Sequence, residues 1–301
     1  MAPAAPPHTP AESLGEITER LEALPGDVRA LVTLNGKEVI AVDTDQAAPL
    51  GSIFKLYVLL AVADAVTAGT ISWDQPLQVS DEVRSLPSGR LQDAETGTTV
   101  TVQEAAELMI SISDNTATDM LIGLVGREAV EAAVVSADHH DPALLRPFLT
   151  TRELFGLLWG DNDEISAAWP TADENARRAL LDDLATHPFD IDLASIDVNS
   201  TETTPMFVDG VEWFASAQDI AAVHAALRDR GAQDATATGA LTINPGVAIN
   251  SELWPSVSFK GGSSPGVLTG SWDAVREDDA KLTVVLLLSD TTGPVSPETQ
   301  S

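Results

Sequence analysis

Residues 49–69 read PLGSIFKLYVLLAVADAVTAG, and this stretch decides the fold. The apolar run that follows Lys55 predicts a long buried helix over residues 52–68, which ends at Gly69. Ser52 and Lys55 are three positions apart, so they share one face of that helix. Because burial in an apolar helix lowers the pKa of a lysine, Lys55 is a candidate for an amine that is neutral near physiological pH.

The Ser52/Lys55 pair has the residue types of an activated nucleophile. A serine hydroxyl is a poor nucleophile until a neighbouring base takes its proton, and a neutral lysine is such a base. The start of the helix adds backbone N–H groups and a positive dipole that stabilise an oxyanion. An isolated S-x-x-K sequence is more often a serine cap followed by a surface lysine, so further motifs must decide.

The segments around this helix predict strands near both chain ends and helices between them. Asn35-Gly36 is a strong hairpin signal between two short β-prone runs. The expected strands are 28–34, 38–42, 256–260, 267–275 and 281–289. The expected helices are 12–24, 101–112, 116–135, 151–159, 175–186 and 216–230. If the two β regions pair, they form one antiparallel sheet into which a helical block is inserted.

This order of elements predicts an α+β fold with two lobes. An α/β sandwich lobe would contain residues 12–50 and 212–301, and an all-helical lobe would contain residues 51–211. Residues 1–11 are rich in proline and alanine, which predicts a disordered tail or linker. No signal peptide is visible, so an extracytoplasmic and a cytoplasmic location both stay open.

Composition narrows the classes of partner. The chain of 301 residues has a formal net charge of −30, with 16 basic against 46 acidic residues. Such a surface repels phosphate backbones and anionic lipid, so we expect no nucleic-acid partner. No apolar run is long enough for a membrane span. A small-molecule or peptide carbonyl compound is the expected partner of a monomeric protein.

Metal and cofactor sites are not expected. The chain has no cysteine, which removes disulfides and thiolate ligands together. His139 and His140 lie between two aspartates, but we expect adjacent histidine side chains to point apart, and no further ligand clusters with them in the sequence. A solvated loop is the simpler interpretation.

Two further motifs follow the serine–lysine pair. Ser113-Asp114-Asn115 stands between two predicted helices, where each residue taken alone is an ordinary helix cap. Lys260-Gly261-Gly262-Ser263 stands on a predicted strand before a hairpin, where it would otherwise be an ordinary glycine-rich turn. The chain holds four lysines, Lys37, Lys55, Lys260 and Lys281, and two of them fall inside these motifs.

In this order, the three motifs resemble those of class A β-lactamases and penicillin-binding proteins. The resemblance covers about residues 28–290, and the sheet built from both chain ends is similar as well. Residues 49–52, 260–263 and 212–216 look like one actinobacterial branch. That branch includes lipoproteins and the β-lactamase-like domain of a clavulanic-acid biosynthesis protein.

The resemblance implies a role for each motif residue. Ser52 would attack a carbonyl carbon and Lys55 would take its proton. Ser113 would relay a proton to the leaving group, and Lys260 would supply positive charge. Asn115 would contact the substrate.

The strand motif would complete the substrate side of the site. The resemblance implies an oxyanion hole formed by the backbone N–H groups of Ser52 and Ser263, with Gly262 beside them in the substrate-binding segment. The usual Lys-Thr-Gly or Lys-Ser-Gly is Lys-Gly-Gly here, so the hydroxyl that helps to bind a substrate carboxylate is missing. Ser263 is the candidate substitute.

A second departure concerns the release of an acyl group. Class A β-lactamases carry a glutamate on an omega loop that activates the deacylating water, whereas residues 136–149 hold no glutamate here. Glu128 and Glu131 come too early, and Glu153 falls inside a predicted helix. We therefore expect a serine hydrolase that acts through a Ser52 acyl-enzyme, with esterase-like or slow acyl-transfer activity and weak or no β-lactam turnover.

Two alternatives stay open. One is a D,D-peptidase-like enzyme acting on peptidoglycan peptides, and the other is a non-catalytic module that keeps the pocket for binding. The intact set of Ser52, Lys55, Ser113 and Lys260 favours an enzyme. The missing glutamate is consistent with a binding module.

Overall fold

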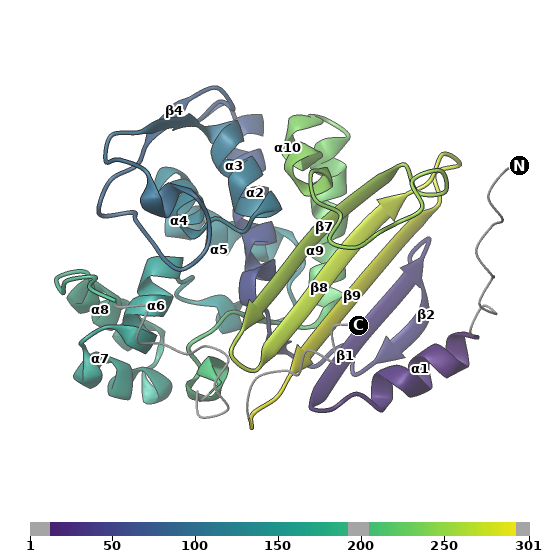
Figure 1. The fold of residues 1–301 in the computed structure, drawn as a ribbon, viewed down its shortest axis with the longest axis horizontal. Coiled ribbons are helices and arrows are strands. Elements are labelled where there is room, and N and C mark those ends of the chain that lie inside the picture. Colours follow the sequence, from purple (N-terminus) through teal and green to yellow (C-terminus); the bar gives the residue numbers. More distant parts are fainter. Residues whose placement is uncertain (1–12, 192–204, 293–301) are drawn as a thin grey trace, which may run out of the picture.

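The sheet in the computed structural model, which describes residues 13–191 and 205–292, joins the two ends of the chain. Its strands are antiparallel and run in the order β2-β1-β9-β8-β7, so the N-terminal hairpin pairs directly with the last strand (Figure 1). The bounds are β1 Asp27–Leu34, β2 Lys37–Val42, β7 Ser256–Ser264, β8 Val267–Val275 and β9 Lys281–Ser289. The predicted α+β fold is confirmed.

Short strand pairs connect the sheet region to the rest of the chain. β3 (Ala48–Pro49) pairs with β6 (Phe214–Ala215), and β4 (Pro76–Gln78) pairs with β5 (Thr99–Thr101). The β3–β6 pair matters for the site, because it holds residues 212–216 next to the segment that precedes Ser52. The sequence patterns did not predict this pairing, since two-residue strands carry no periodic signal.

The helices gather mainly on one side of the sheet (Figure 1). Capping boxes start α1, α3, α6 and α9, which is why the sequence located their first residues well. The helices of the described residues are α1 Leu14–Glu22, α2 Lys55–Thr67, α3 Val102–Ser111, α4 Asn115–Val125, α5 Arg127–Ser136, α6 Thr151–Trp159, α7 Asp163–Ala168, α8 Glu174–Leu184, α9 Ala217–Gly231 and α10 Thr236–Gly239.

The single helix predicted over 116–135 is wrong. Gly126 has φ +86° and ends α4, and α5 begins at the next residue. Glycine adopts this backbone conformation without the steric cost that a side chain would bring. The short helix α7 was also missed, because six residues are too few for a periodic pattern.

Helix α2 is the centre of the core. Its residues from Lys55 to Ala63 are all buried, and α2 contacts α3, α4, α5 and α9. Full burial of such side chains stabilises the fold by about 1.5–3 kcal/mol each. The surrounding helices therefore fix the position of the helix that carries Lys55.

Within the described residues, no helix combines the length and the apolar character that a membrane span requires. The tail predicted at 1–11 lies outside the described residues, and the division into two lobes stays a prediction.

Candidate active site

The candidate nucleophile lies at the start of the central helix, in contact with a large cavity. Ser52 belongs to a 3-10 turn, η1 (Gly51–Phe54), that leads directly into α2. It is half-buried and lines a cavity of about 590 Å³ between the sheet edge and the helices. Its backbone N–H lies at the helix start, where the resemblance requires an oxyanion donor.

Lys55 is the central hydrogen-bond donor of the site. Its side chain is fully buried, and its Nζ donates to Ser113 O at 2.7 Å, Ser113 Oγ at 3.0 Å and Asn115 Oδ1 at 2.7 Å. Burial lowers the pKa of Lys55 well below its usual value, and the charge of Lys260 lowers it further. The lowered pKa favours the neutral amine, which is the form that a general base requires.

The second motif holds its side chains toward Lys55 through a strained turn. Ser113 has φ +60°, in the left-handed region that few residues other than glycine enter. Asp114 caps α4 by accepting from Ala117 N at 2.9 Å, and it also accepts from Arg90 N at 2.6 Å. Asn115 Nδ2 donates to Leu86 O at 2.6 Å, which leaves its oxygen directed at the lysine.

Lys260 joins the same cluster from strand β7. Its Nζ donates to Ser113 Oγ at 3.2 Å and to Gly261 O at 2.7 Å, and the residue is 3% exposed. Burial lowers the pKa of Lys260 to about 7. The structure thus places Ser113 Oγ between two amines, so this hydroxyl has proton carriers on both sides.

The strand motif touches the nucleophile turn backbone to backbone. A Cβ atom built on Gly262 would lie 2.4 Å from Leu50 O and 2.6 Å from Ser52 N, and one built on Gly51 would lie 2.8 Å from Ser263 N. Side chains at these two glycines are therefore excluded by sterics. This contact brings the N–H groups of Ser52 and Ser263 to the same side of the cavity.

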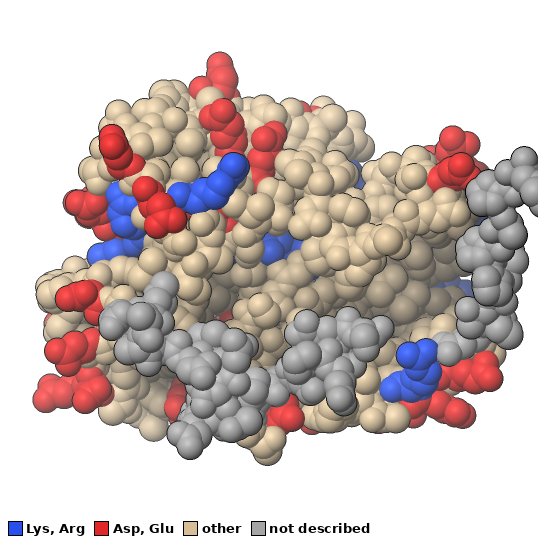
Figure 2. Space-filling view, viewed as in Figure 1, with Lys and Arg blue, Asp and Glu red and all other residues tan. Residues whose placement is uncertain are grey.

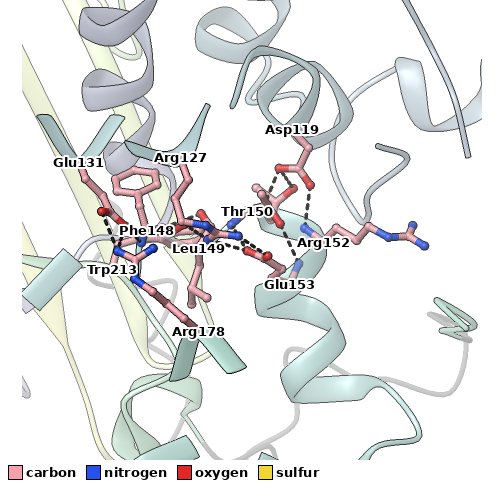
Figure 3. Close-up of polar contacts among 11 residues, drawn as sticks. Asp119, Arg127, Glu131, Phe148, Leu149, Thr150, Arg152, Glu153, Arg178 and Trp213 are labelled. Atoms are coloured by element: carbon pink, nitrogen blue, oxygen red, sulfur yellow. Dashed lines mark hydrogen bonds and ion pairs between the residues drawn. The ribbon is translucent and has the colours of Figure 1, made fainter. Parts of the chain in front are cut away.

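The loop between α5 and α6 holds its nearby carboxylates in ion pairs and caps (Figure 3). Glu131 accepts from Phe148 N and pairs with Arg178 at 2.8 Å. Glu153 caps Thr150 and pairs with Arg127 at 2.5 Å. Glu153 is the first glutamate after the loop of residues 136–149, and its carboxylate faces Arg127.

Asp119 holds the first turn of α6 against the second motif. It accepts from Thr151 N at 2.8 Å, from Thr151 Oγ1 at 2.9 Å and from Arg152 N at 2.8 Å (Figure 3). Thr151 Oγ1 also lies 3.3 Å from Asn115 O. Burial raises the pKa of Asp119 to about 7 despite these donors. Helix α6 is therefore fixed rigidly beside Asn115.

Glu212 is a pocket residue to which the sequence assigned no role. It lines the cavity and is 5% exposed. Its carboxylate accepts from Trp213 N at 2.9 Å, from Ser264 Oγ at 3.1 Å and from the backbone of Gly51. Burial raises its pKa to about 7. The carboxylate thus connects the nucleophile turn to the end of β7.

The expectation that the two adjacent histidine side chains point apart is wrong. The rings of His139 and His140 stack at 5.5 Å, and Asp219 from α9 lies beside both. His140 Nδ1 is 2.7 Å from Asp219 Oδ2, which also accepts from Ser216 Oγ. His139 Nδ1 accepts from Asp141 N, so its other nitrogen carries the proton of the neutral ring. His140 Nδ1 and His139 Nδ1 are thus engaged in hydrogen bonds, whereas His139 Nε2 is buried 3.8 Å from Asp219 Oδ2 without a hydrogen-bond partner among the described residues.

Three tryptophans line two separate hollows. Trp254 and Trp272 line an apolar groove on the sheet that does not include Ser52. Trp159 lines the cavity, together with Phe155 from the same helix. Which face of a helix meets a cavity depends on tertiary packing, so the sequence pattern did not reveal it.

Comparisons with known proteins agree with this geometry. Residues 15–238 match the model of a family described as the β-lactamase enzyme family. β-Lactamase VEB-1 of Pseudomonas aeruginosa is 26% identical over 112 residues, which span 36% of this chain and 38% of that protein.

Solved structures show the same fold. A β-lactamase from Sphaerobacter thermophilus is 21% identical, with a TM-score of 0.63 over 92% of this chain and 88% of that one. A representative of class A β-lactamase from Bacteroides cellulosilyticus is 17% identical, with a TM-score of 0.63 over the same two shares. At these identities the likeness concerns the fold.

Proposed function

The chain belongs to the β-lactamase enzyme family, and from this premise we propose that it is a serine hydrolase that acts through an acyl-enzyme on Ser52. The single observation that carries the proposal is the hydrogen-bonded cluster of Lys55, Ser113, Asn115 and Lys260 beside Ser52. Its residues come from α2, the turn before α4, and β7, so the whole fold converges on this point.

The proposed reaction has two halves that balance. In the first, Ser52 Oγ attacks the carbonyl carbon and neutral Lys55 takes the hydroxyl proton. Ser113 passes its proton to the departing oxygen or nitrogen as the bond to carbon breaks, and Lys55 returns a proton to Ser113 along their hydrogen bond. In the second, water attacks the acyl-enzyme and gives up a proton, the bond between carbon and Ser52 Oγ breaks, Ser52 Oγ takes up a proton, and a carboxylic acid leaves. Backbone N–H groups of Ser52 and Ser263 would hold the oxyanion in both halves.

We propose that small esters are better substrates than β-lactams. Asp138 and Asp141 are in the loop before α6, but Asp141 caps the following turn, and Glu153 is paired with Arg127. Among the described residues, the carboxylates of Asp141 and Glu153 are therefore engaged elsewhere, which supports a slow second half-reaction. Deacylation of a bulky β-lactam adduct should be slow, so any penicillin that reacts should remain on Ser52.

Intact mass and ester hydrolysis together test this function. The wild-type protein and Ser52→Ala are incubated with nitrophenyl acetate and with a panel of penicillins and cephalosporins. We expect ester hydrolysis and a mass increase by one acyl group in the wild type, and neither in the variant. Hydrolysis at the wild-type rate by Ser52→Ala would refute the assignment, and no reaction with any compound would favour the binding module.

A D-Ala-D-Ala peptide, added to this panel, tests the D,D-peptidase alternative. Its cleavage in preference to the esters would favour that alternative. The likeness of residues 212–216 to the actinobacterial clavulanic-acid branch stays a prediction.

A further inference from the structure

Part of the cavity wall is an apolar surface that one helix supplies. Helix α6 presents Thr151, Leu154, Phe155 and Trp159 to the cavity. These positions follow the i, i+3, i+4 and i+8 spacing of a single helical face. The helix is therefore oriented so that an aromatic stripe faces the candidate nucleophile.

The two aromatic rings of this stripe form one preformed surface. Phe155 and Trp159 stack with their centroids 4.9 Å apart and their planes 19° from parallel. Both residues are half-buried, so each keeps part of its surface exposed. Because Asp119 and the Thr150–Glu153 capping box anchor the first turn of α6, the surface is held in place before any ligand arrives.

The rest of the wall adds no positive charge. Among the described residues that line the cavity none is a lysine or an arginine, and the charged one is Glu212. The amines of Lys55 and Lys260 are buried and are not among the lining residues, and their hydrogen bonds go to Ser113, Asn115 and Gly261. The protein around the cavity carries a net charge of −30, and Asp and Glu side chains lie along the edges of the face in Figure 2.

The position of the leaving group decides which part of a substrate meets the aromatic surface. Ser113 Oγ, the proposed proton donor to the leaving group, lies between Lys55 and Lys260. The leaving group would therefore lie next to Ser113 and Lys260. The acyl group would then extend toward the other lining residues, among which α6 supplies Leu154, Phe155 and Trp159.

We propose that the site selects neutral esters with an aromatic or bulky apolar acyl group, which packs against Phe155 and Trp159. This inference rests on the proposed function. A neutral acyl chain gains the burial that the aromatic pair offers. An acyl chain that ends in a carboxylate loses hydration on this apolar surface and finds no lysine or arginine among the described residues that line the cavity. The carboxylic acid formed on hydrolysis would be repelled by the same acidic surroundings, which favours its release.

A matched set of nitrophenyl esters tests the inference. The acyl groups are acetyl, 3-phenylpropanoyl, and the glutaric half-ester, which is extended like the phenylpropanoyl group but ends in a carboxylate. Burial of a phenyl ring should raise kcat/KM of the phenylpropanoate about ten- to a hundredfold above that of the acetate. The half-ester should fall below the acetate.

Variants of α6 locate the effect. The readout is the ratio of kcat/KM for phenylpropanoate to that for acetate, which cancels general losses of activity. Phe155→Ala and Trp159→Ala should each lower this ratio at least about threefold, and Trp159→Phe should restore most of it. Leu158→Ala is the matched control, because Leu158 is a half-buried apolar residue of the same helix outside the cavity lining, and it should leave the ratio unchanged.

The outcomes distinguish a failure of the proposed acyl-group selectivity from a failure of the proposed Ser52-dependent hydrolysis. Equal kcat/KM for acetate and phenylpropanoate, or a preference for the half-ester, would overturn the inference while Ser52-dependent hydrolysis still stands. A ratio that does not change in Phe155→Ala and Trp159→Ala would overturn it as well. Hydrolysis that survives in Ser52→Ala would instead refute the proposed function itself.

Discussion

A single methyl group placed on Gly262 should disable the site. The Cβ atom would lie 2.4 Å from Leu50 O, 2.6 Å from Ser52 N and 2.6 Å from Thr269 Oγ1. Ordinary contact begins at 3.4 Å, so β7 and the nucleophile turn must separate by about 1 Å, a misplacement that costs about a hundredfold in rate. Loss of one oxyanion donor costs about a hundred- to a thousandfold. We therefore expect Gly262→Ala to lower kcat at least about a hundredfold.

The neighbouring glycine supplies the matched control. A Cβ atom on Gly261 would lie 2.9 Å from Cζ of Phe259 and 3.5 Å from Thr269 O, so a ring that can rotate takes up most of the overlap. Gly261→Ala should stay within about threefold of wild type. Both variants are assayed with nitrophenyl acetate, and thermal unfolding gives the folded fraction. Wild-type turnover by folded Gly262→Ala would refute the placement of the oxyanion hole between Ser52 and Ser263.

Three further outcomes follow from the charges of the structure. Burial and the charge of Lys260 hold the pKa of Lys55 low, so kcat should fall as pH drops through that pKa. Removal of the Lys260 charge should raise the pKa of Lys55, so the residual kcat of Lys260→Ala should begin to fall at a higher pH than in the wild type. A fall at the same pH in both proteins would exclude an effect of the Lys260 charge on Lys55. Burial lowers the pKa of His224 to about 4, below about 6.5 in the unfolded chain, so the unfolded state binds more protons between these values and stability falls as pH drops through them. Denaturant titration should show this fall to be smaller in His224→Gln, by up to about 3 kcal/mol at pH 4, whereas equal pH dependence would contradict the assignment. Glu153 is paired with Arg127, so Glu153→Gln should not lengthen the lifetime of a β-lactam adduct measured by mass spectrometry, and a longer lifetime would identify Glu153 as the deacylation base.

The features predicted correctly from the sequence carry their signal locally. The predicted strands 267–275 and 281–289 match β8 and β9 at both ends. Turn residues on either side of a β-prone run mark where the strand begins and ends. Helices α3, α6 and α9 begin within one residue of their predicted starts, and each begins with a capping box, which is a local signal. The three motifs meet in space through the hydrogen bonds of Lys55 and Lys260 to Ser113. Ser113 reaches both lysines from a left-handed turn.

The features that were missed depend on contacts between distant segments. Asp219 lies 79 positions from His140 in the sequence, and no local pattern announces that the two side chains meet. Glu212 stands in a segment whose role appears only when β6 pairs with β3. Trp254 precedes the strand of the third motif in the sequence, and Trp272 pairs with Phe259 of that strand. Alternate residues of a strand face opposite sides of the sheet, so Trp272 and Lys260 lie on different faces. Both tryptophans line the separate groove.

Helix α6 connects the weak deacylation predicted from the sequence with the apolar cavity seen in the structure. The loop before it contains no glutamate, and the first turn of α6 instead places Thr151 beside Asn115, with Asp119 behind it. From that anchor the helical period carries Phe155 and Trp159 along the cavity wall. A wall of this kind binds an acyl group well and positions a water molecule poorly, since an apolar surface offers water no hydrogen bond. The proposed affinity for the acyl group and the proposed slow attack by water on bulky adducts would therefore have one structural cause, the helix that begins where the resemblance calls for a catalytic loop.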